Sequence, residues 1–204
     1  MIIQEICRHS PERPLVLFFL GYAFRPESIA HPASKNYDLF AVYDYRSNEF
    51  DPSLLKDREV ILVAWSMGVW VANKVFKNVP LKQAIAVNGT PFGIHETFGI
   101  PPRTFKRTID RFDFELFKKW CFLSDASKVN FPFAENPKEE LCALYEASAE
   151  PVEEDIRWDK AIVSKKDLVF PPAASACFKC PVKTLAAPHY PFYRLSSLEE
   201  ILEF

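Results

Sequence analysis

The chain has 204 residues, of which 49% are hydrophobic, and a formal net charge of -2. This length supports one substantial core and is too short for two domains of ordinary size, so we expect a single domain. The small net charge provides no overall attraction to nucleic acid. No apolar stretch approaches the roughly 20 residues that cross a bilayer. The composition therefore favours a globular enzyme or binding protein with no nucleic-acid or membrane partner.

The first residues lack the basic start and continuous apolar stretch of a signal peptide, because Glu5, Arg8 and Glu12 interrupt them. We therefore expect a cytoplasmic protein whose five cysteines are reduced thiols. Cys177 and Cys180 form one C-x-x-C pair with no second pair or adjacent histidine to complete a zinc site. We interpret them as two incidental thiols on a helix and expect no metal or other cofactor.

Six apolar, β-branched or aromatic runs predict buried strands, because parallel strands covered on both faces lose the polar alternation of half-exposed ones. A helix is expected from Met67 to Asn78, between the third and fourth runs. This strand, helix and strand succession is typical of a βαβ unit, so the fold class should be α/β with a mostly parallel central sheet. The six predicted strands are Leu15–Leu20, Leu39–Tyr43, Val60–Trp65, Gln83–Val87, Lys160–Ser164 and Val182–Ala186.

A segment of about residues 92–155 breaks this alternation and predicts a helical lid insertion. Apolar residues recur there at helical spacing with no strand between them, and a further short helix is expected around 141–145. Such an insertion usually covers a site at the carboxyl edge of the sheet. A last short helix is expected near 195–202. The apolar residues at helical spacing are Phe105, Ile109, Phe112, Leu116, Phe117 and Trp120.

Ser66 is the strongest candidate for a catalytic residue. It stands between a predicted strand and a predicted helix, with the small residues Ala64 and Gly68 two positions to either side. A serine nucleophile on a strained strand-to-helix turn needs small neighbours there, because larger side chains would collide across the turn. The same turn directs the N–H of Met67 toward a developing oxyanion. Alternatively, Ser66 only caps the helix, as serine often does.

A nucleophilic serine needs a base and an acid that follow it in the chain in the order serine, acid, histidine. His189 follows the last predicted strand and is our choice of base, with His95 in reserve. Asp167 follows the preceding strand and would orient and stabilise the imidazole of His189. Asp125 is the alternative acid, and Asp167 itself could be an ordinary surface aspartate beside two lysines.

The second oxyanion donor is expected in the loop after the first central strand. Gly21 would let the backbone approach the nucleophile closely, and the N–H of Tyr22 is our candidate donor. Gly21 could also be only a turn glycine.

Six segments spread over most of the chain carry a resemblance to a known family: Phe18–Tyr22, Val42–Arg46, Ala64–Gly68, Ala86–Pro91, Phe98–Pro101 and Pro188–Phe192. The sequence resembles the BioG type of pimeloyl-[acyl-carrier protein] methyl ester esterase, within the α/β-hydrolase superfamily. This resemblance implies an α/β-hydrolase fold with Ser66, Asp167 and His189 as the triad. It also implies release of methanol from the methyl ester of pimeloyl carrier protein in biotin precursor synthesis. This sequence departs from the family pattern at two positions. Tyr22 stands where relatives often have tryptophan, and Ala64 stands where the superfamily usually has glycine.

The resemblance makes an acyl carrier protein the expected partner. Arg103, Arg107 and Arg111 are spaced four apart, so one helix would place them along one face, where they could attract an acidic carrier. An ordinary solvated helix face would look the same. Two other functions stay open: a broad short-chain carboxylesterase or thioesterase, and a non-catalytic binding module with the same fold. The oligomeric state is expected to be a monomer.

Overall fold

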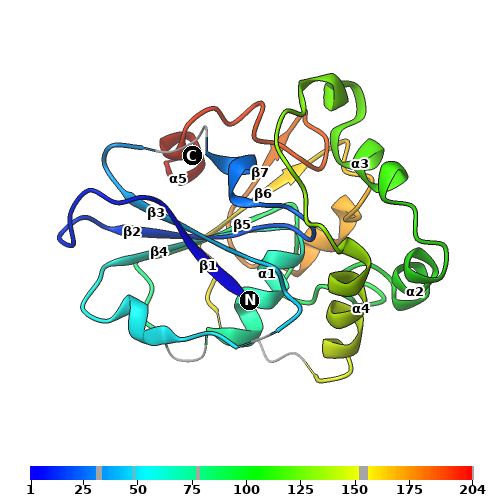
Figure 1. Cartoon of the computed structure of the whole chain (residues 1–204), viewed down its shortest axis with the longest axis horizontal. Helices are drawn as coiled ribbons and strands as arrows, with labels where there is room; N and C mark the ends of the chain where they lie inside the picture. The colour runs from blue at the N-terminus through cyan, green and yellow to red at the C-terminus, as the bar shows by residue number, and fades with distance from the viewer. Residues whose placement is uncertain (31–33, 48, 77–78, 152–155, 204) are drawn as a thin grey trace.

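The computed structural model describes residues 1–30, 34–47, 49–76, 79–151 and 156–203. Within these residues, seven strands form one sheet in the order β1-β3-β2-β4-β5-β6-β7. β1 runs antiparallel to β3, and the other neighbouring strands are parallel. The mostly parallel sheet predicted from the sequence is thus confirmed (Figure 1). The strands are β1 (Ile2–Cys7), β2 (Leu15–Phe19), β3 (Asp38–Tyr43), β4 (Val60–Trp65), β5 (Gln83–Val87), β6 (Lys160–Ser164) and β7 (Val182–Leu185).

The predicted strand bounds agree with the structure to within one residue. Three of the six predicted strands, β4, β5 and β6, have the expected first and last residues. β1 was not expected from the sequence, and its residues are half-buried or exposed at the edge of the sheet. Its mixture of apolar and charged residues lacks the continuous apolar run by which the buried strands were recognised.

Two apolar layers enclose the sheet, because alternate residues of each buried strand point to opposite faces. Leu15, Leu17 and Phe19 pack on the face covered by α1, whereas Val16 and Phe18 pack on the face covered by α5. The helices are α1 (Met67–Val75), α2 (Pro102–Asp110), α3 (Phe114–Phe122), α4 (Pro137–Ala147) and α5 (Leu198–Leu202). Short 3-10 helices are η1 (Pro26–Ile29), η2 (Pro52–Leu55), η3 (Leu123–Lys128) and η4 (Pro172–Cys177).

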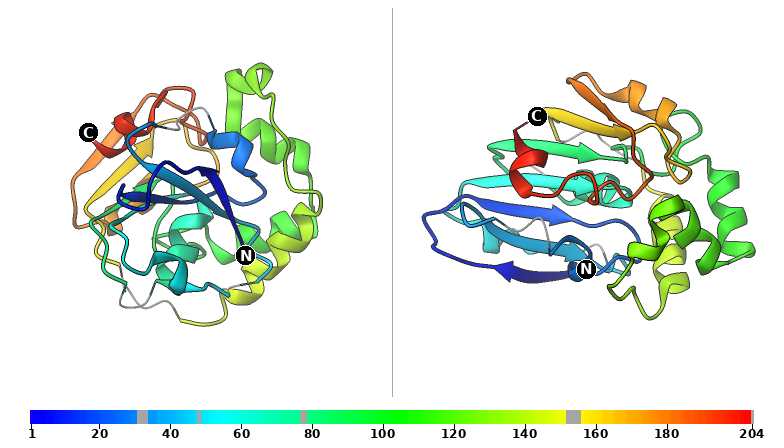
Figure 2. Two further views of the ribbon diagram at one scale, coloured as in Figure 1. Left: turned by 60° about the vertical axis from the view of Figure 1, so that its left-hand side comes forward. Right: turned by 90° about the horizontal axis from the view of Figure 1, so that it is seen from above.

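The segment between β5 and β6 is helical, as expected. α2, α3 and α4 lie beyond the carboxyl ends of the parallel strands (Figure 2). We call residues 102–147 the helical insertion. Its first helix begins at Pro102, within the expected segment of about 92–155, and the expected end at residue 155 lies outside the described residues. The helices therefore stand where they can cover a site at this edge.

Three finer expectations about helices were wrong. α1 ends at Val75, and the expected last residue, Asn78, lies outside the described residues. α5 begins at Leu198, because the preceding residues form turns after Pro191. Cys177 ends η4 and Cys180 lies beyond it, so the two thiols do not share a helix. In the described part of the chain, no helix is long and apolar enough to cross a membrane.

Candidate active site

Ser66 follows β4 directly and stands immediately before α1. Its backbone has φ 59° and ψ -130°, a conformation that costs free energy for a residue with a side chain. Its side chain makes no capping hydrogen bond to α1, which removes the interpretation of Ser66 as a simple helix cap. Instead, its Oγ lies 2.9 Å from Nε2 of His189. The strained turn thus presents the hydroxyl to an imidazole rather than to the helix.

Close backbone contacts around Ser66 depend on glycine. A Cβ at Gly68 would lie 2.4 Å from the carbonyl oxygen of Leu20, and one at Gly89 would lie 2.1 Å from that of Ser66. Both distances are too short for any real side chain. The glycine at position 68 was expected from the turn motif, whereas the close approach of Gly89 comes from tertiary packing.

His189 connects Ser66 to a carboxylate. Its Nδ1 lies 2.8 Å from Oδ2 of Asp167, and its side chain is fully buried. The other carboxylate oxygen of Asp167 accepts the N–H groups of Val169 and Phe170, both at 2.8 Å. These two bonds fix the carboxylate so that its free oxygen faces the imidazole. The structure therefore brings together Ser66, His189 and Asp167 in the order serine, imidazole, carboxylate.

The loop that carries His189 is held by Trp65 at the end of β4 and by Asn88, which directly follows β5. Nδ2 of Asn88 donates to the carbonyl oxygen of His189 at 2.7 Å, and Nε1 of Trp65 donates to the same oxygen at 3.1 Å. Asn88 also exchanges two hydrogen bonds with Ser164, after which the loop to Asp167 begins. Asn88 was not among the residues expected at the site. In the sequence, only its place in the Ala86–Pro91 segment, which carries part of the family resemblance, pointed to Asn88.

The alternative base and acid lie elsewhere. Nδ1 of His95 accepts the N–H groups of Thr97 and Phe98 within its own loop. The carboxylate of Asp125 pairs with Lys128 at 2.8 Å and with Arg194 at 3.1 Å. These cations lower the pKa of Asp125, with the hydrogen bond from Lys128 as the largest cause. Both residues have local partners of their own and neither contacts the Ser66–His189 pair.

Two backbone N–H groups are candidates for an oxyanion hole. Tyr22 and Met67 line the same cavity as Ser66, and within the described residues neither N–H has a backbone acceptor. A Cβ at Gly21 would lie 3.2 Å from Cβ of Ser66, so the chain before Tyr22 passes close to the serine. Unfilled donors beside a serine hydroxyl are suited to stabilise a negatively charged oxygen.

A cavity of about 80 Å³ opens beside Ser66 under the helical insertion. Most of its wall is apolar, and all three insertion helices contribute to it, which suits an aliphatic chain. The phenol of Tyr22 is buried there without a hydrogen-bond partner among the described residues, and burial raises its pKa. The lining side chains are Tyr22, Ser66, Met67, Ile100, Thr104, Phe105, Thr108, Phe112, Asp113, Phe117, Trp120, Leu141, Leu168 and Val169.

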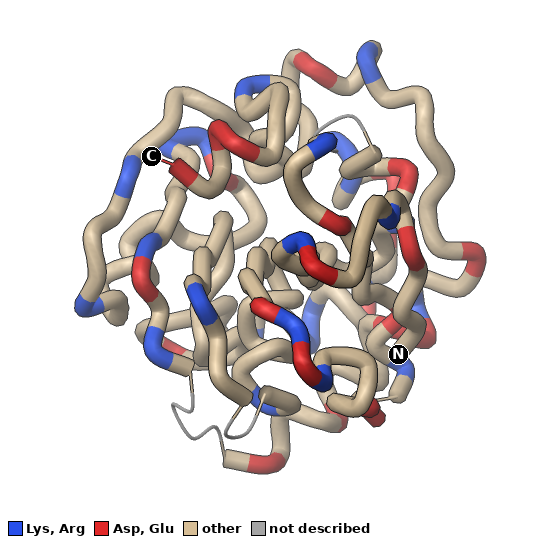
Figure 3. The backbone as a smooth tube through the Cα atoms, turned by 90° about the vertical axis from the view of Figure 1, so that its left-hand side faces the viewer, with Lys and Arg blue, Asp and Glu red and all other residues tan. Residues whose placement is uncertain are grey.

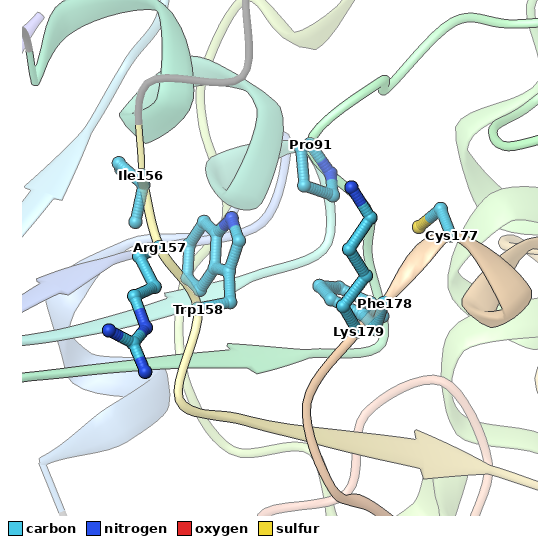
Figure 4. A pocket seen from close by; sticks show the side chains of 7 residues that line it. All are labelled: Pro91, Ile156, Arg157, Trp158, Cys177, Phe178 and Lys179. Carbon is cyan, nitrogen blue, oxygen red and sulfur yellow. The ribbon is translucent and has the colours of Figure 1, made fainter.

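A larger hollow of about 330 Å³ lies apart from Ser66, near residues 156–158 and 177–179 (Figure 4). In that view the charged ends of Arg157 and Lys179 point in different directions. The indole N–H of Trp158 is buried without a partner among the described residues. The described residues that line it include no serine and histidine paired as Ser66 is paired with His189, so size alone does not make this hollow the reactive site. Among the described residues, no three His, Cys, Asp or Glu side chains gather into a possible metal site.

The three arginines of the helical insertion do not all lie on one helix. Arg103 and Arg107 are exposed on α2, but this helix ends at Asp110 and Arg111 is its non-helical cap. The expectation of three arginines along one helical face was therefore wrong for Arg111. Arg103 and Arg107 are next in sequence to Thr104 and Thr108, which line the cavity. On the opposite side of the molecule, Figure 3 shows segments of both charges interspersed.

Comparisons with known proteins support the fold and the family. The profile of the family described as "Pimeloyl-ACP methyl esterase BioG" matches residues 4–201. A crystal structure of BioG from Haemophilus influenzae has a TM-score of 0.90 and 30% identity, with coverage of 98% of this chain and 99% of that one. An enol-lactonase from Burkholderia xenovorans has a TM-score of 0.67 at 13% identity, covering 95% and 90% of the two chains. That similarity shows only the fold.

A longer relative shares part of its sequence with this chain. The malonyl-[acyl-carrier protein] O-methyltransferase of Bacteroides fragilis is 39% identical over 169 residues, which cover 77% of this chain. The match covers only 34% of that protein, so the chain spans about a third of its length. The predicted α/β-hydrolase fold and the predicted family are both confirmed by these comparisons. The chain belongs to the BioG family of pimeloyl-ACP methyl esterases.

Proposed function

We propose that this protein is a serine esterase that hydrolyses the methyl ester of pimeloyl-[acyl-carrier protein] to the free carboxylate and methanol. The observation that carries the proposal is the continuous hydrogen-bonded series from Oγ of Ser66 through His189 to Asp167, at 2.9 Å and 2.8 Å. Family membership supports the substrate, because the family is described as a pimeloyl-ACP methyl esterase.

In the first half of the reaction, Oγ of Ser66 attacks the ester carbonyl carbon while Nε2 of His189 accepts the hydroxyl proton. The negative charge moves to the carbonyl oxygen, where the N–H groups of Tyr22 and Met67 stabilise it. The tetrahedral intermediate then breaks the bond to the methoxy oxygen. His189 returns its proton to that oxygen, so methanol leaves and the acyl group stays on Ser66.

In the second half, His189 removes a proton from water, and the hydroxide formed attacks the acyl carbon on Ser66. The collapse of this second intermediate breaks the bond to Oγ, which recovers its proton from His189. The product is the free carboxylate. Throughout, Asp167 holds the imidazole in one orientation and stabilises its protonated form, because its carboxylate is fixed by the N–H groups of Val169 and Phe170.

The cavity supports an acyl substrate with a long aliphatic part. Its apolar lining would bury methylene groups of the acyl chain, each contributing about 0.8 kcal/mol when removed from water. Arg103 and Arg107 are exposed and are next in sequence to the cavity-lining residues Thr104 and Thr108, so they would attract the acidic surface of a carrier protein near the cavity. The named activity of the B. fragilis relative is also chemistry of a methyl ester on an acyl carrier protein, and part of that protein is similar to this chain.

The direct test is to incubate the purified protein with the methyl ester of pimeloyl carrier protein and to follow the carrier by mass spectrometry. We expect loss of one methyl group, with the thioester to the carrier intact. The free methyl ester of a short acid serves as the comparison substrate. Release of the whole acyl chain from the carrier would instead indicate a thioesterase, and no change in the carrier with rapid cleavage of the free ester would indicate a broad carboxylesterase.

A further inference from the structure

Glu140 is a buried carboxylate that the proposed reaction does not use. It lies on α4 of the helical insertion and is 3% exposed, yet it has no cationic partner among the salt bridges of the described residues. Its Oε2 accepts the N–H of Ala23 at 3.1 Å, and its Oε1 accepts the N–H of Tyr45 at 3.1 Å. One carboxylate thus joins the insertion to the loops after β2 and β3.

The first of these loops contains the candidate oxyanion donor. Ala23 directly follows Tyr22, and its φ of 65° is a conformation that alanine rarely adopts. Its N–H belongs to the peptide group that joins it to Tyr22. Because Oε2 of Glu140 binds this N–H, it fixes the orientation of a peptide next to the Tyr22 N–H. Without that acceptor, the strained turn could relax and rotate the Tyr22 N–H away from Ser66.

The second bond limits movement of the carboxylate itself. The loop after β3 has another unusual conformation, with φ of 59° at Asp44, and the phenol of Tyr45 donates to the carbonyl oxygen of Leu20. Leu20 lies two residues before Tyr22. The bonds of Glu140 and Tyr45 therefore hold the loop after β2 from both ends. A neutral side chain with one acceptor could satisfy only one of the two N–H groups.

Burial raises the pKa of Glu140 to about 7, although the two backbone N–H groups oppose this rise. Other charged groups surround it. Asp44 raises its pKa and Arg46 lowers it, while the amino group of Met1 and the phenol of Tyr22 also lie within range of its charge. Ionising a carboxylate in so dry a place is costly, and the two backbone N–H groups offset part of this cost.

We propose that Glu140 is a positioning residue that holds the Tyr22 N–H in the oxyanion hole by accepting the N–H of Ala23. This proposal rests on the proposed esterase function but not on the identity of the acyl group. The N–H that Glu140 positions binds the charged intermediate more strongly than the bound ester, so loss of Glu140 should lower kcat and leave KM nearly unchanged.

The test compares Glu140→Gln and Glu140→Ala with the control Glu139→Gln. Glu139 is the preceding carboxylate of α4, but it is exposed and pairs with Arg46 rather than with the oxyanion loop. The substrate is a small p-nitrophenyl ester, so docking of a carrier plays no part. Titration of active sites with a fluorophosphonate gives the concentration of folded enzyme, so each kcat refers to intact sites only.

We expect Glu140→Gln to reduce kcat by about tenfold to a hundredfold with KM within about twofold, and Glu140→Ala to reduce it further. The control should match the parent protein. A variant with intact sites and an unchanged kcat would overturn the proposal, as would equal losses in the control. If the parent protein cleaves this ester but not the pimeloyl carrier ester, the proposed substrate fails while Glu140 is still tested.

The parent protein offers a second measurement, in case neither variant folds. Neutral Glu140 directs an O–H toward one of the two N–H groups, so protonation should weaken its hold on the loop. kcat should therefore fall as the pH drops through about 7, where Glu140 gains its proton, while KM changes little. A kcat that stays constant between pH 8 and pH 6 would overturn the proposal.

Discussion

The loops that carry the proposed triad and the helical insertion beside them are built in different ways. Ser66, Asp167 and His189 each follow a parallel strand, and all three are buried and hydrogen-bonded across the sheet. The charged residues of the insertion are mostly exposed and pair with near neighbours in sequence, as Lys106 does with Asp110. The rigid sheet can thus fix the reacting atoms, whereas the insertion can vary its surface to suit a substrate.

This comparison predicts that changes at the strand ends affect every ester, whereas changes on the insertion surface affect the carrier-linked ester alone. Glu140 is an exception to this division between strand ends and insertion surface. It belongs to the insertion by sequence, but its carboxylate binds the loops at the strand ends. It should therefore behave like a residue of the triad region.

The largest effect is expected for Ser66→Ala, which removes the attacking oxygen. Because the triad acts as a unit, kcat should fall by a factor on the order of 10⁴ or more on both the carrier-linked and the free ester. The variant should remain folded, since the hydroxyl makes no bond to α1. Steady-state rates and a thermal melt check both points. Residual activity of more than a few per cent on every ester would rule out Ser66 as the nucleophile.

Asp167→Asn should have the next largest effect, a loss in kcat on the order of a thousandfold or more on both esters. The amide removes the charge that stabilises protonated His189 and can present an N–H where the imidazole needs an acceptor. Asp125→Asn is the matched control, because Asp125 is as buried but pairs with Lys128 and Arg194. The control should lose stability and keep its kcat per folded site. If kcat instead fell in Asp125→Asn and stayed unchanged in Asp167→Asn, Asp125 would be the acid in place of Asp167.

The two regions also differ in how far the sequence predicts them. Ser66, Asp167 and His189 could be located because each follows an apolar run, and parallel strands bring their carboxyl ends to one edge. The position of each residue after a predicted strand was thus enough to predict that the three lie close together. Asn88 and Gly89 could not be assigned in this way, because their contacts with His189 and Ser66 depend on how adjacent loops pack.

In the insertion, helical spacing predicted helices but not their ends. The apolar repeat continues through Phe112, yet Asp113 accepts the N–H of Leu116 and starts a new helix there. Arg111 consequently falls in the break. In the sequence, Glu140 does not differ from an ordinary charged residue of a solvated helix. Its contacts with Ala23 and Tyr45, which are 117 and 95 positions away, distinguish it.

Glu140 should also make stability depend on pH. Its pKa in the folded protein is about 7, above the ordinary value of 4.5, so the folded state holds this proton more tightly than the unfolded state. Its contribution to the free energy of unfolding is therefore greatest below pH 4.5 and is lost as pH rises through about 7. This loss amounts to about 3 kcal/mol.

Glu140→Gln cannot ionise, so its stability relative to the parent protein should improve by about this amount between pH 4.5 and pH 8. Urea unfolding over that range measures the difference. Glu139→Gln is again the control and should show a nearly constant difference, because Glu139 is exposed. A constant difference for Glu140→Gln as well would mean that Glu140 keeps an ordinary pKa in the folded protein. Ionisation of Glu140 would then lower the free energy of unfolding at neutral pH no more than ionisation of Glu139 does.

The smallest effect is expected for the combined change Arg103→Glu and Arg107→Glu. Both side chains are exposed on α2, next to the cavity-lining residues Thr104 and Thr108, so they can act on a carrier protein without touching the reacting atoms. Long-range attraction between exposed charges is moderate and is screened by salt. We expect kcat/KM for the carrier-linked ester to fall about tenfold at low salt, with little change for a small free ester.

Added salt should lower kcat/KM of the parent protein on the carrier-linked ester and should have much less effect on the double variant. The control is Lys35→Glu with Lys56→Glu, which makes the same change in net charge on exposed residues just before β3 and β4. Those positions lie at the amino ends of the strands, opposite the insertion. Equal losses in both double variants would show that net charge alone attracts the carrier. A loss on the free ester as well would show that α2 has been displaced from the cavity, since its Phe105 is part of the wall.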